Sequence, residues 1–318
     1  MTTYARQGRG VVVAILVALA VPATAFADAP TATTNAATGV GQDAATLHGT
    51  VNPKGNSSVV AFQYGTSKIY GTNTPAAGVG AGNKAVKVAA PIGALAPNTT
   101  YHFRVVVQYS NGNRNAFGKD RTFKTKKQPL GVSLVASDNR VRAGTTVQLL
   151  GQVTGTDYEG QQVVLQTNPY PFAGFANTGN PQVILHEGTF SFPVIVSVNT
   201  SYRVVLPDHP EIVSPVVSVV VPVRVFLKVG KRVRRGHKIK FRGRITPVNE
   251  NAPVQIQRRF HGVWVTVART HVTDSGAGSS FFHKKVKVVR SGRYRALVTP
   301  GAAYAANTSR VHRIRIKH

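Results

Sequence analysis

Alternation of apolar and polar residues runs through most of the chain and predicts β-strands. The clearest case is the stretch from residue 101 to residue 107. Four apolar side chains fall on one side of it: Tyr101, Phe103, Val105 and Val107. Successive strand side chains point to opposite faces of a sheet, so this pattern predicts a strand with one buried face. The preceding Pro97 and Asn98 favour a tight turn.

A tyrosine at the entry of such a strand suits a tyrosine corner, in which the ring is buried and the hydroxyl bonds back to the chain. Weaker versions of the pattern begin at Tyr202 and Tyr294. Further alternating stretches are separated by turn signals such as Asn52-Pro53-Lys54-Gly55 and Asn111-Gly112. Because no helical period of useful length is present, the sequence predicts an all-β protein of three tandem antiparallel sandwiches.

The first third of the chain resembles a bacterial fibronectin type III module. Four motifs carry the resemblance, in order: Ala45-Thr46-Leu47-His48-Gly49-Thr50-Val51-Asn52-Pro53-Lys54-Gly55, Phe62-Gln63-Tyr64-Gly65, Leu95-Ala96-Pro97-Asn98-Thr99-Thr100-Tyr101-His102-Phe103-Arg104 and Thr122-Phe123-Lys124-Thr125. Leu47 replaces the core Trp of the animal modules, and no Arg-Gly-Asp tripeptide occurs. The resemblance implies an extracellular spacer or binding module without catalytic residues.

The remaining two thirds contain an internal duplication. Gly144 and Gly236 end similar basic turns and lie 92 residues apart, as do Gly151 and Gly243. A constant offset over many positions indicates a repeated module. The two copies resemble the immunoglobulin-like sandwiches found in tandem on bacterial surface proteins. Without cysteine, no inter-sheet disulfide supports this second resemblance.

These patterns predict a leader and three domains. The boundaries are residues 1–27 for a signal peptide, 28–128 for a fibronectin type III-like domain, 129–222 for an immunoglobulin-like domain and 223–318 for a basic immunoglobulin-like domain. Arg6 and Arg9 precede the apolar run Val11–Val21, and Ala25-Phe26-Ala27 suits cleavage. The sequence therefore predicts a protein secreted to the cell envelope or beyond, with no transmembrane span after cleavage. Retention of the segment as an anchor is the alternative.

The positive charge is strongly uneven along the chain. The formal net charge is +28. Residues 129–222 are mildly acidic, whereas residues 223–318 contain 23 Lys and Arg against only Glu250 and Asp274. Such an excess predicts attraction to polyanions and says nothing about the fold.

The cations of the last domain keep the period of a strand and are the candidate polyanion-binding residues. They are Lys238, Lys240, Arg242, Arg244, Lys285, Lys287, Arg313, Arg315 and Lys317. Like charges two residues apart on a strand lie about 7 Å from each other, within the Debye length of about 8 Å. Their mutual repulsion lowers stability, and a bound anionic polymer, such as a cell-wall or other extracellular polymer, would offset it. A solvated basic face that maintains solubility is the alternative.

The sequence offers no convincing catalytic, cofactor or metal site. Cysteine chemistry is excluded by composition, no Gly-x-Ser-x-Gly elbow occurs, and no His pair has zinc-ligand spacing. No motif for sequence-specific nucleic-acid binding is present. We therefore predict a protein that is not an enzyme and that holds neither cofactor nor metal; the sequence leaves its oligomeric state open.

An alternative function belongs to the middle domain, where a loop rich in Pro and Gly carries three aromatic residues. They are Tyr170, Phe172 and Phe175. If exposed, they suit a carbohydrate-binding accessory module of a secreted hydrolase system. If they fold back onto the core, the loop is only structural. The main hypothesis is a secreted binding or spacer protein whose last domain contacts anionic polymers.

Overall fold

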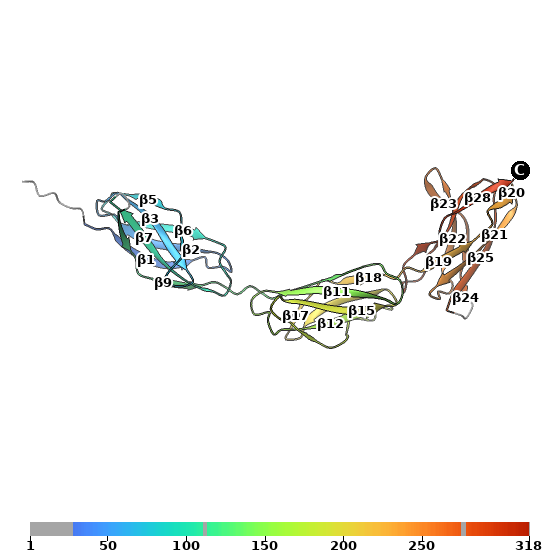
Figure 1. The fold of residues 1–318 in the computed structure, drawn as a ribbon, viewed down its shortest axis with the longest axis horizontal. Helices are drawn as coiled ribbons and strands as arrows, with labels where there is room; N and C mark the ends of the chain where they lie inside the picture. Colours follow the sequence, from blue (N-terminus) through green and yellow to red (C-terminus); the bar gives the residue numbers. More distant parts are fainter. Residues whose placement is uncertain (1–27, 111–112, 275–277, 318) are drawn as a thin grey trace, which may run out of the picture. The chain divides into compact units, whose positions relative to one another are not determined.

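The computed structural model describes residues 28–110, 113–274 and 278–317, and all the regular structure in these ranges is β-strand (Figure 1). The predicted signal peptide and the predicted turn at Asn111-Gly112 lie outside the described residues. Within the described ranges, nothing has the helical length and hydropathy that a membrane span needs. The chain divides into two compact units, and the boundary in the sequence falls between Lys126 and Lys127.

The first unit contains one antiparallel sandwich with two sheets. Its strands are β1 (Thr31–Thr38), β2 (Ala45–Asn52), β3 (Ser58–Gly65), β4 (Thr72–Asn73), β5 (Ala77–Gly80), β6 (Val86–Ile92), β7 (Thr100–Tyr109), β8 (Arg114–Phe117) and β9 (Arg121–Lys124). One sheet has the order β1-β2-β6, and the other has β4-β3-β7-β8 with β5 and β9 at its sides. This division of strands between two sheets is the plan of immunoglobulin-like sandwiches. Leu47, Phe62 and Phe103 fill the core, as their alternation predicts.

The second unit begins with another sandwich. Its strands are β10 (Gly131–Ala136), β11 (Thr145–Thr154), β12 (Gln162–Pro169), β13 (Ala176–Asn177), β14 (Gln182–Val183), β15 (Thr189–Val196), β16 (Thr200–Leu206), β17 (His209–Val213) and β18 (Val217–Val219). Strands β10-β11-β15 form one sheet, and β13-β12-β16-β17 with β14 and β18 form the facing one. Leu149, Leu165 and Tyr202 lie in its core.

The third sandwich completes this unit and repeats the plan of the second. Its strands are β19 (Arg224–Lys228), β20 (Arg232–Arg234), β21 (Lys238–Thr246), β22 (Pro253–Phe260), β23 (Val263–His271), β24 (Thr273–Asp274), β25 (Ser280–Lys287), β26 (Gly292–Val298), β27 (Asn307–Thr308) and β28 (His312–Lys317). The sheets have the orders β19-β21-β25-β24 and β20-β28-β26-β22-β23, with β27 beside β26. The all-β fold of three tandem sandwiches predicted from the sequence is therefore confirmed, while the residue boundaries of the domains stay a prediction.

The internal duplication is visible in the packing of two glycines. A Cβ placed on Gly151 would lie 2.1 Å from Cζ of Phe190, and one on Gly243 would lie 2.0 Å from Cζ of Phe282. Gly151 lies on β11 directly opposite Phe190 of β15, and Gly243 lies on β21 directly opposite Phe282 of β25. Each glycine thus makes room for a buried ring, which explains why both recur at the same offset.

The tyrosine corner is present in the first sandwich. The hydroxyl of Tyr101 accepts a hydrogen bond from the backbone N–H of Ala96, at 2.9 Å, and the ring is buried in the core. Asn98 in the connecting turn has φ of +53°, as its tolerance of left-handed backbone allows. In the third sandwich the hydroxyl of Tyr294 donates to the carbonyl of Arg290, at 3.0 Å. The strand entries predicted from these two tyrosines are therefore fixed by local hydrogen bonds.

Replacing Tyr101 with phenylalanine is expected to destabilise the first sandwich by about 1 kcal/mol. The ring still fits, but the N–H of Ala96 loses its acceptor. Urea unfolding followed by tyrosine and tryptophan fluorescence together with circular dichroism measures the change. A variant with unaltered stability would show that the hydroxyl contributes nothing to the corner.

Candidate polyanion interface

The candidate site begins with the outer surface of the sheet that contains β21 and β25. Along β21, Lys238, Lys240, Arg242 and Arg244 are exposed, while Phe241 and Ile245 between them are buried. On β25, Lys285 and Lys287 are exposed. The alternation predicted for these two strands is therefore the one observed, and their cations share one solvent-facing surface.

The pairing of the strands brings these cations into rows. Lys238 lies directly opposite Lys287, and Lys240 lies opposite Lys285. A third row joins Lys228 on β19 to Arg242 and His283. Side chains directly opposite each other have Cβ atoms about 5 Å apart, and like charges in such positions are destabilising. We call this surface the first basic face, made of Lys228, Lys238, Lys240, Arg242, Arg244, His283, Lys285 and Lys287.

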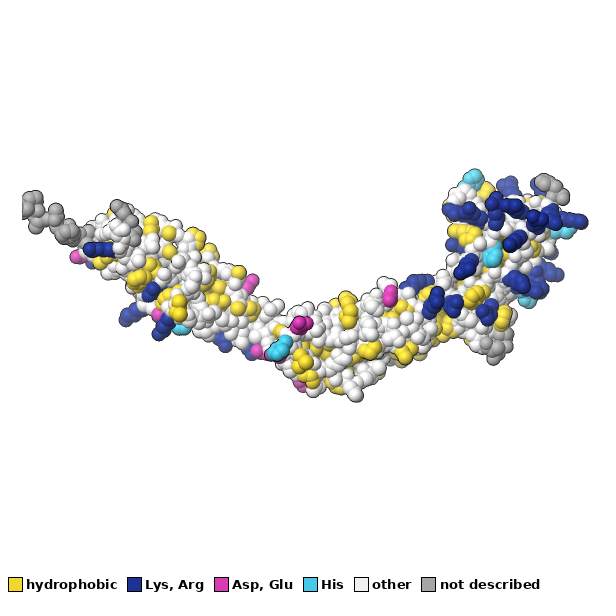
Figure 2. Space-filling view, in the orientation of Figure 1, with side chains coloured by type: hydrophobic (Ala, Val, Ile, Leu, Met, Phe, Trp, Pro, Cys, Tyr) yellow, Lys and Arg dark blue, Asp and Glu magenta, His cyan; other side chains and the backbone are white. Residues whose placement is uncertain are grey.

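No carboxylate neutralises the first basic face within the described part of the chain. The ion pairs of the described residues belong to the first two sandwiches: His102 with Asp120, Lys127 with Asp157, His186 with Glu159, and His209 with Glu211. Figure 2 shows the same contrast, with dark blue side chains crowded on the third sandwich and sparse on the second. The repulsion within the face is therefore not offset by an ion pair among the described residues.

Two aromatic rings interrupt the cations at one end of this face. Phe226 and Phe281 flank Arg244 on the neighbouring strands and remain 40% and 42% exposed. The guanidinium of Arg244 lies 4.8 Å from the centroid of Phe226, and that of Arg224 lies 5.3 Å from it. These cation–π contacts hold both guanidinium groups in place over an apolar base.

The other three predicted residues lie on the opposite sheet. Arg313, Arg315 and Lys317 are the exposed residues of β28, while Ile314 between them is buried. The alternation is again the predicted one. Because β28 belongs to the sheet with β20 and β26, the nine candidate residues form two groups on two faces of the sandwich.

The aromatic loop of the second sandwich is only partly open to solvent. Tyr170 and Phe172 are 44% and 42% exposed, and their rings meet edge to face at 5.9 Å and 89°. Phe175 is half-buried, and the guanidinium of Arg203 covers it at 4.3 Å. The three rings therefore offer an angled pair and a covered ring, and no flat platform.

Sequence reasoning missed a unit that recurs in all three sandwiches. In each unit, Nε of an arginine donates a hydrogen bond across the strands to Oε1 of a glutamine, and an aromatic ring lies against the guanidinium. The three pairs are Arg104 with Gln63, Arg203 with Gln166, and Arg295 with Gln257, at 2.9, 2.7 and 2.9 Å. Each arginine lies one or three residues after the tyrosine near the start of its strand. This spacing is the feature of the sequence from which the unit could have been predicted. Because each guanidinium is held by two partners, we interpret these arginines as structural.

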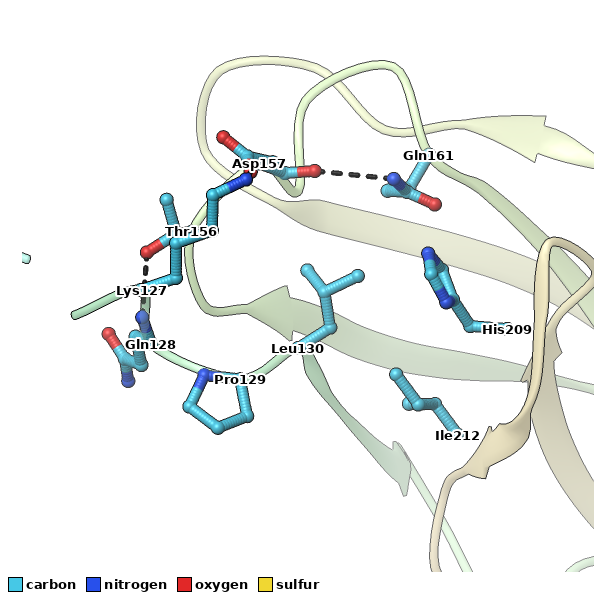
Figure 3. A pocket seen from close by; sticks show the side chains of 9 residues that line it. All are labelled: Lys127, Gln128, Pro129, Leu130, Thr156, Asp157, Gln161, His209 and Ile212. Carbon is cyan, nitrogen blue, oxygen red and sulfur yellow. Dashed lines mark hydrogen bonds and ion pairs between the residues drawn. The ribbon is translucent and has the colours of Figure 1, made fainter. Parts of the chain in front are cut away.

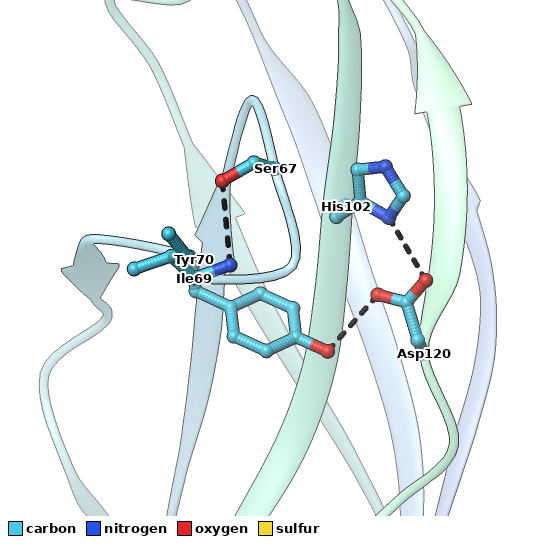
Figure 4. Close-up of polar contacts among 5 residues, drawn as sticks. All are labelled: Ser67, Ile69, Tyr70, His102 and Asp120. Atoms are coloured by element: carbon cyan, nitrogen blue, oxygen red, sulfur yellow. Dashed lines mark hydrogen bonds and ion pairs between the residues drawn. The ribbon is translucent and has the colours of Figure 1, made fainter.

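A second polar cluster in the first sandwich joins β7 to the loop after β3 (Figure 4). Asp120 accepts a hydrogen bond from the hydroxyl of Tyr70 at 3.0 Å, and its other oxygen lies 2.8 Å from Nδ1 of His102. Burial alone would raise the pKa of Asp120, but the bonds from His102 and Tyr70 outweigh it and hold the pKa below its ordinary value of 3.8. Burial and the hydrogen bond to Asp120 raise the pKa of Tyr70. We interpret this network as a structural link between Asp120, β7 and the loop after β3.

The carboxylate of Asp120 is expected to stabilise the first sandwich at neutral pH. Because its folded pKa lies below the unfolded value, this contribution is present above about pH 4 and disappears as the pH falls through the folded pKa. Asp120→Asn should therefore be less stable than the wild type at pH 7, and the difference should shrink at about pH 2. Urea unfolding at both pH values measures this; a difference that persists unchanged in acid would contradict it.

A cavity at the start of the second unit measures about 570 Å³ (Figure 3). Pro129, Leu130 and Ile212 give it an apolar wall. Gln161 donates to the carbonyl of Asp157 at 3.3 Å, and its buried Oε1 has no hydrogen-bond partner among the described residues. Among the described residues, no three His, Asp or Glu side chains lie close enough together to hold a metal ion.

Comparisons with known proteins give structural similarities of low identity. No protein-family model matches the chain, and no curated protein matches its sequence. The sensor domain of the anti-sigma factor RsgI4 from Pseudobacteroides cellulosolvens is 23% identical, with a TM-score of 0.26; the match covers 32% of this chain and 98% of that one. The FN1–FN3 domains of chicken CNTN1 are 12% identical, with a TM-score of 0.29, over 91% of this chain and 98% of that one.

A third similar structure contains the three N-terminal domains of the Hoc outer capsid protein of bacteriophage RB49. It is 13% identical, with a TM-score of 0.23, and the match covers 91% of this chain and all of the other. The strand order and strand pairing of this chain define its fold without these similarities.

Proposed function

We propose that this is a secreted, non-enzymatic binding and spacer protein of the cell envelope, and that its third sandwich binds anionic polymers. The first two sandwiches, whose charge is far smaller, hold the basic sandwich away from the point of attachment or present it to its ligand. Binding is by neutralisation of several charges at once and does not read a sequence, so no sequence-specific nucleic acid is expected as the partner.

The observation that carries this proposal is the pairing of like charges across β21 and β25. Lys238 faces Lys287 and Lys240 faces Lys285 with no described acidic partner. A solvated surface made basic only for solubility gains nothing from placing its cations in register, and it loses stability by doing so. A polymer with anions along its backbone turns the same rows into favourable contacts.

Carbohydrate binding by the second sandwich is a second proposal, supported by the exposure of Tyr170 and Phe172. A perpendicular pair of rings suits contact with one or two sugar rings at the end of a chain better than with a flat crystalline surface. Such contacts depend on stacking, so they are insensitive to salt.

One binding experiment separates the two proposals. The full chain is applied to immobilised long-chain polyphosphate, to alginate and to neutral dextran over a series of salt concentrations. We expect retention on both anionic polymers, elution by moderate salt and no retention on dextran. Salt-insensitive retention on dextran would contradict the electrostatic proposal and favour the aromatic loop.

A further inference from the structure

The third sandwich carries cations on both of its outer faces, and we propose that it binds two anionic chains at once and thereby cross-links them. This inference depends on the proposed function, because it takes the basic faces as polyanion-binding surfaces. It goes further by making the domain a bivalent connector between polymers, instead of a single point of attachment.

The second basic face lies on the sheet that contains β20, β26 and β28. It is made of Arg232, Arg234, Arg293, Arg313, Arg315 and Lys317, all exposed. Its cations again form rows: Arg232 lies opposite Arg315, Arg234 opposite Lys317, and Arg293 opposite Arg313. The second face therefore repeats the unfavourable in-register pairing that marks the first.

A hollow on the second basic face is lined by cations alone. It measures about 220 Å³, and its lining residues are Lys231, Arg232, Arg313 and Arg315. The backbone N–H of Arg315 donates to the carbonyl of Lys231 at 2.9 Å, which fixes the short strand β20 against β28. Guanidinium groups bind phosphate with two parallel hydrogen bonds, so the hollow suits a phosphate or sulfate group of a polymer backbone.

The two faces are separated by the core of the sandwich, so they act independently. Phe241 and Phe282 lie buried behind the first face, and Ile314 lies buried behind the second. Packed sheets are about 10 Å apart, and the side chains of each face extend outward from there. Because the cations of both faces extend into solvent, salt screens most of the interaction between them beyond the Debye length of about 8 Å. An anionic chain on one face therefore leaves the charge of the other face free for a second chain.

The test compares variants that remove the same number of charges from each face. The first-face variant changes Lys238, Lys240, Arg242, Arg244, Lys285 and Lys287 to Gln, and the second-face variant changes Arg232, Arg234, Arg293, Arg313, Arg315 and Lys317 to Gln. All twelve positions are exposed, and circular dichroism with thermal melting verifies that each variant folds. Calorimetry with short-chain polyphosphate gives the number of chains bound, and turbidity with long-chain polyphosphate reports cross-linking.

We expect the wild type to bind two short chains and to make long chains turbid. Each single-face variant should bind one short chain and produce no turbidity, because one face remains. If the wild type binds one short chain, and one variant retains all of the binding while the other loses it, the bivalent proposal is wrong but the proposed function survives. If the wild type binds no polyphosphate at low salt, both are wrong.

Discussion

Changing Lys238, Lys240, Arg242 and Arg244 to Gln should weaken the binding of long-chain polyphosphate to the first basic face by about a hundredfold at moderate salt, while binding to the second basic face remains. Each phosphate contact releases condensed counterions, and four lost contacts lower the slope of log K against log salt by about three to four. These four side chains are the exposed residues of β21 at the centre of the first basic face. Binding measured by fluorescence anisotropy over a salt series gives both quantities.

The matched control removes four exposed lysines from the first unit, by changing Lys84, Lys87, Lys124 and Lys126 to Gln. Both variants have the same net charge, so a general effect of charge would weaken them equally. The β21 variant should also melt at the same temperature as the wild type or at a higher one, because like-charge repulsion is relieved. Equal binding by the β21 variant and the wild type would show that this strand is not the contact.

Replacing Gly243 with alanine should destabilise the third sandwich by about 1–3 kcal/mol, in the range found for overpacked cores. The added Cβ would lie 2.0 Å from two ring atoms of Phe282 and 2.9 Å from the carbonyl oxygen of Phe226. The ring can move only at the expense of the core packing behind it, and the backbone carbonyl has less freedom still. Thermal unfolding followed by the fluorescence of Trp264, the single tryptophan, reports on this sandwich directly.

Gly301→Ala is the control for this prediction, because a Cβ at position 301 meets no atom within 4 Å. Combining Gly243→Ala with Phe282→Leu should recover part of the loss, since the smaller side chain makes room for the Cβ. A Gly243→Ala variant as stable as the wild type would show that packing does not require the glycine. In that case the double variant would lose only the stability that the ring of Phe282 contributes.

The sequence was sufficient to predict where the strands lie and which face of each strand is buried. Strand side chains alternate with a period of two, so Phe241 and Ile245 had to face the core if the lysines and arginines between them faced water. Tyr101 was sufficient to predict a strand entry because its hydrogen bond to Ala96 is formed only five residues away. Local features of this kind depend on few residues and are visible in the sequence.

The sequence did not reveal which strands become neighbours or in what register. That Lys238 faces Lys287, and that Arg313 lies on a different face from both, depends on pairings between strands far apart in the chain. The units of Arg104 with Gln63 and of Arg295 with Trp264 were missed for the same reason, since their members lie 31 or more residues apart. Such contacts are determined by the closed sandwich and by no single stretch of sequence.

The most direct test of the account is retention on isolated bacterial cell envelopes, measured for the full chain, the β21 variant and the four-lysine control over a salt series. We predict that the wild type and the control are retained at low salt and eluted together by moderate salt, while the β21 variant elutes at clearly lower salt. Equal retention of all three proteins, unaffected by salt, would contradict it.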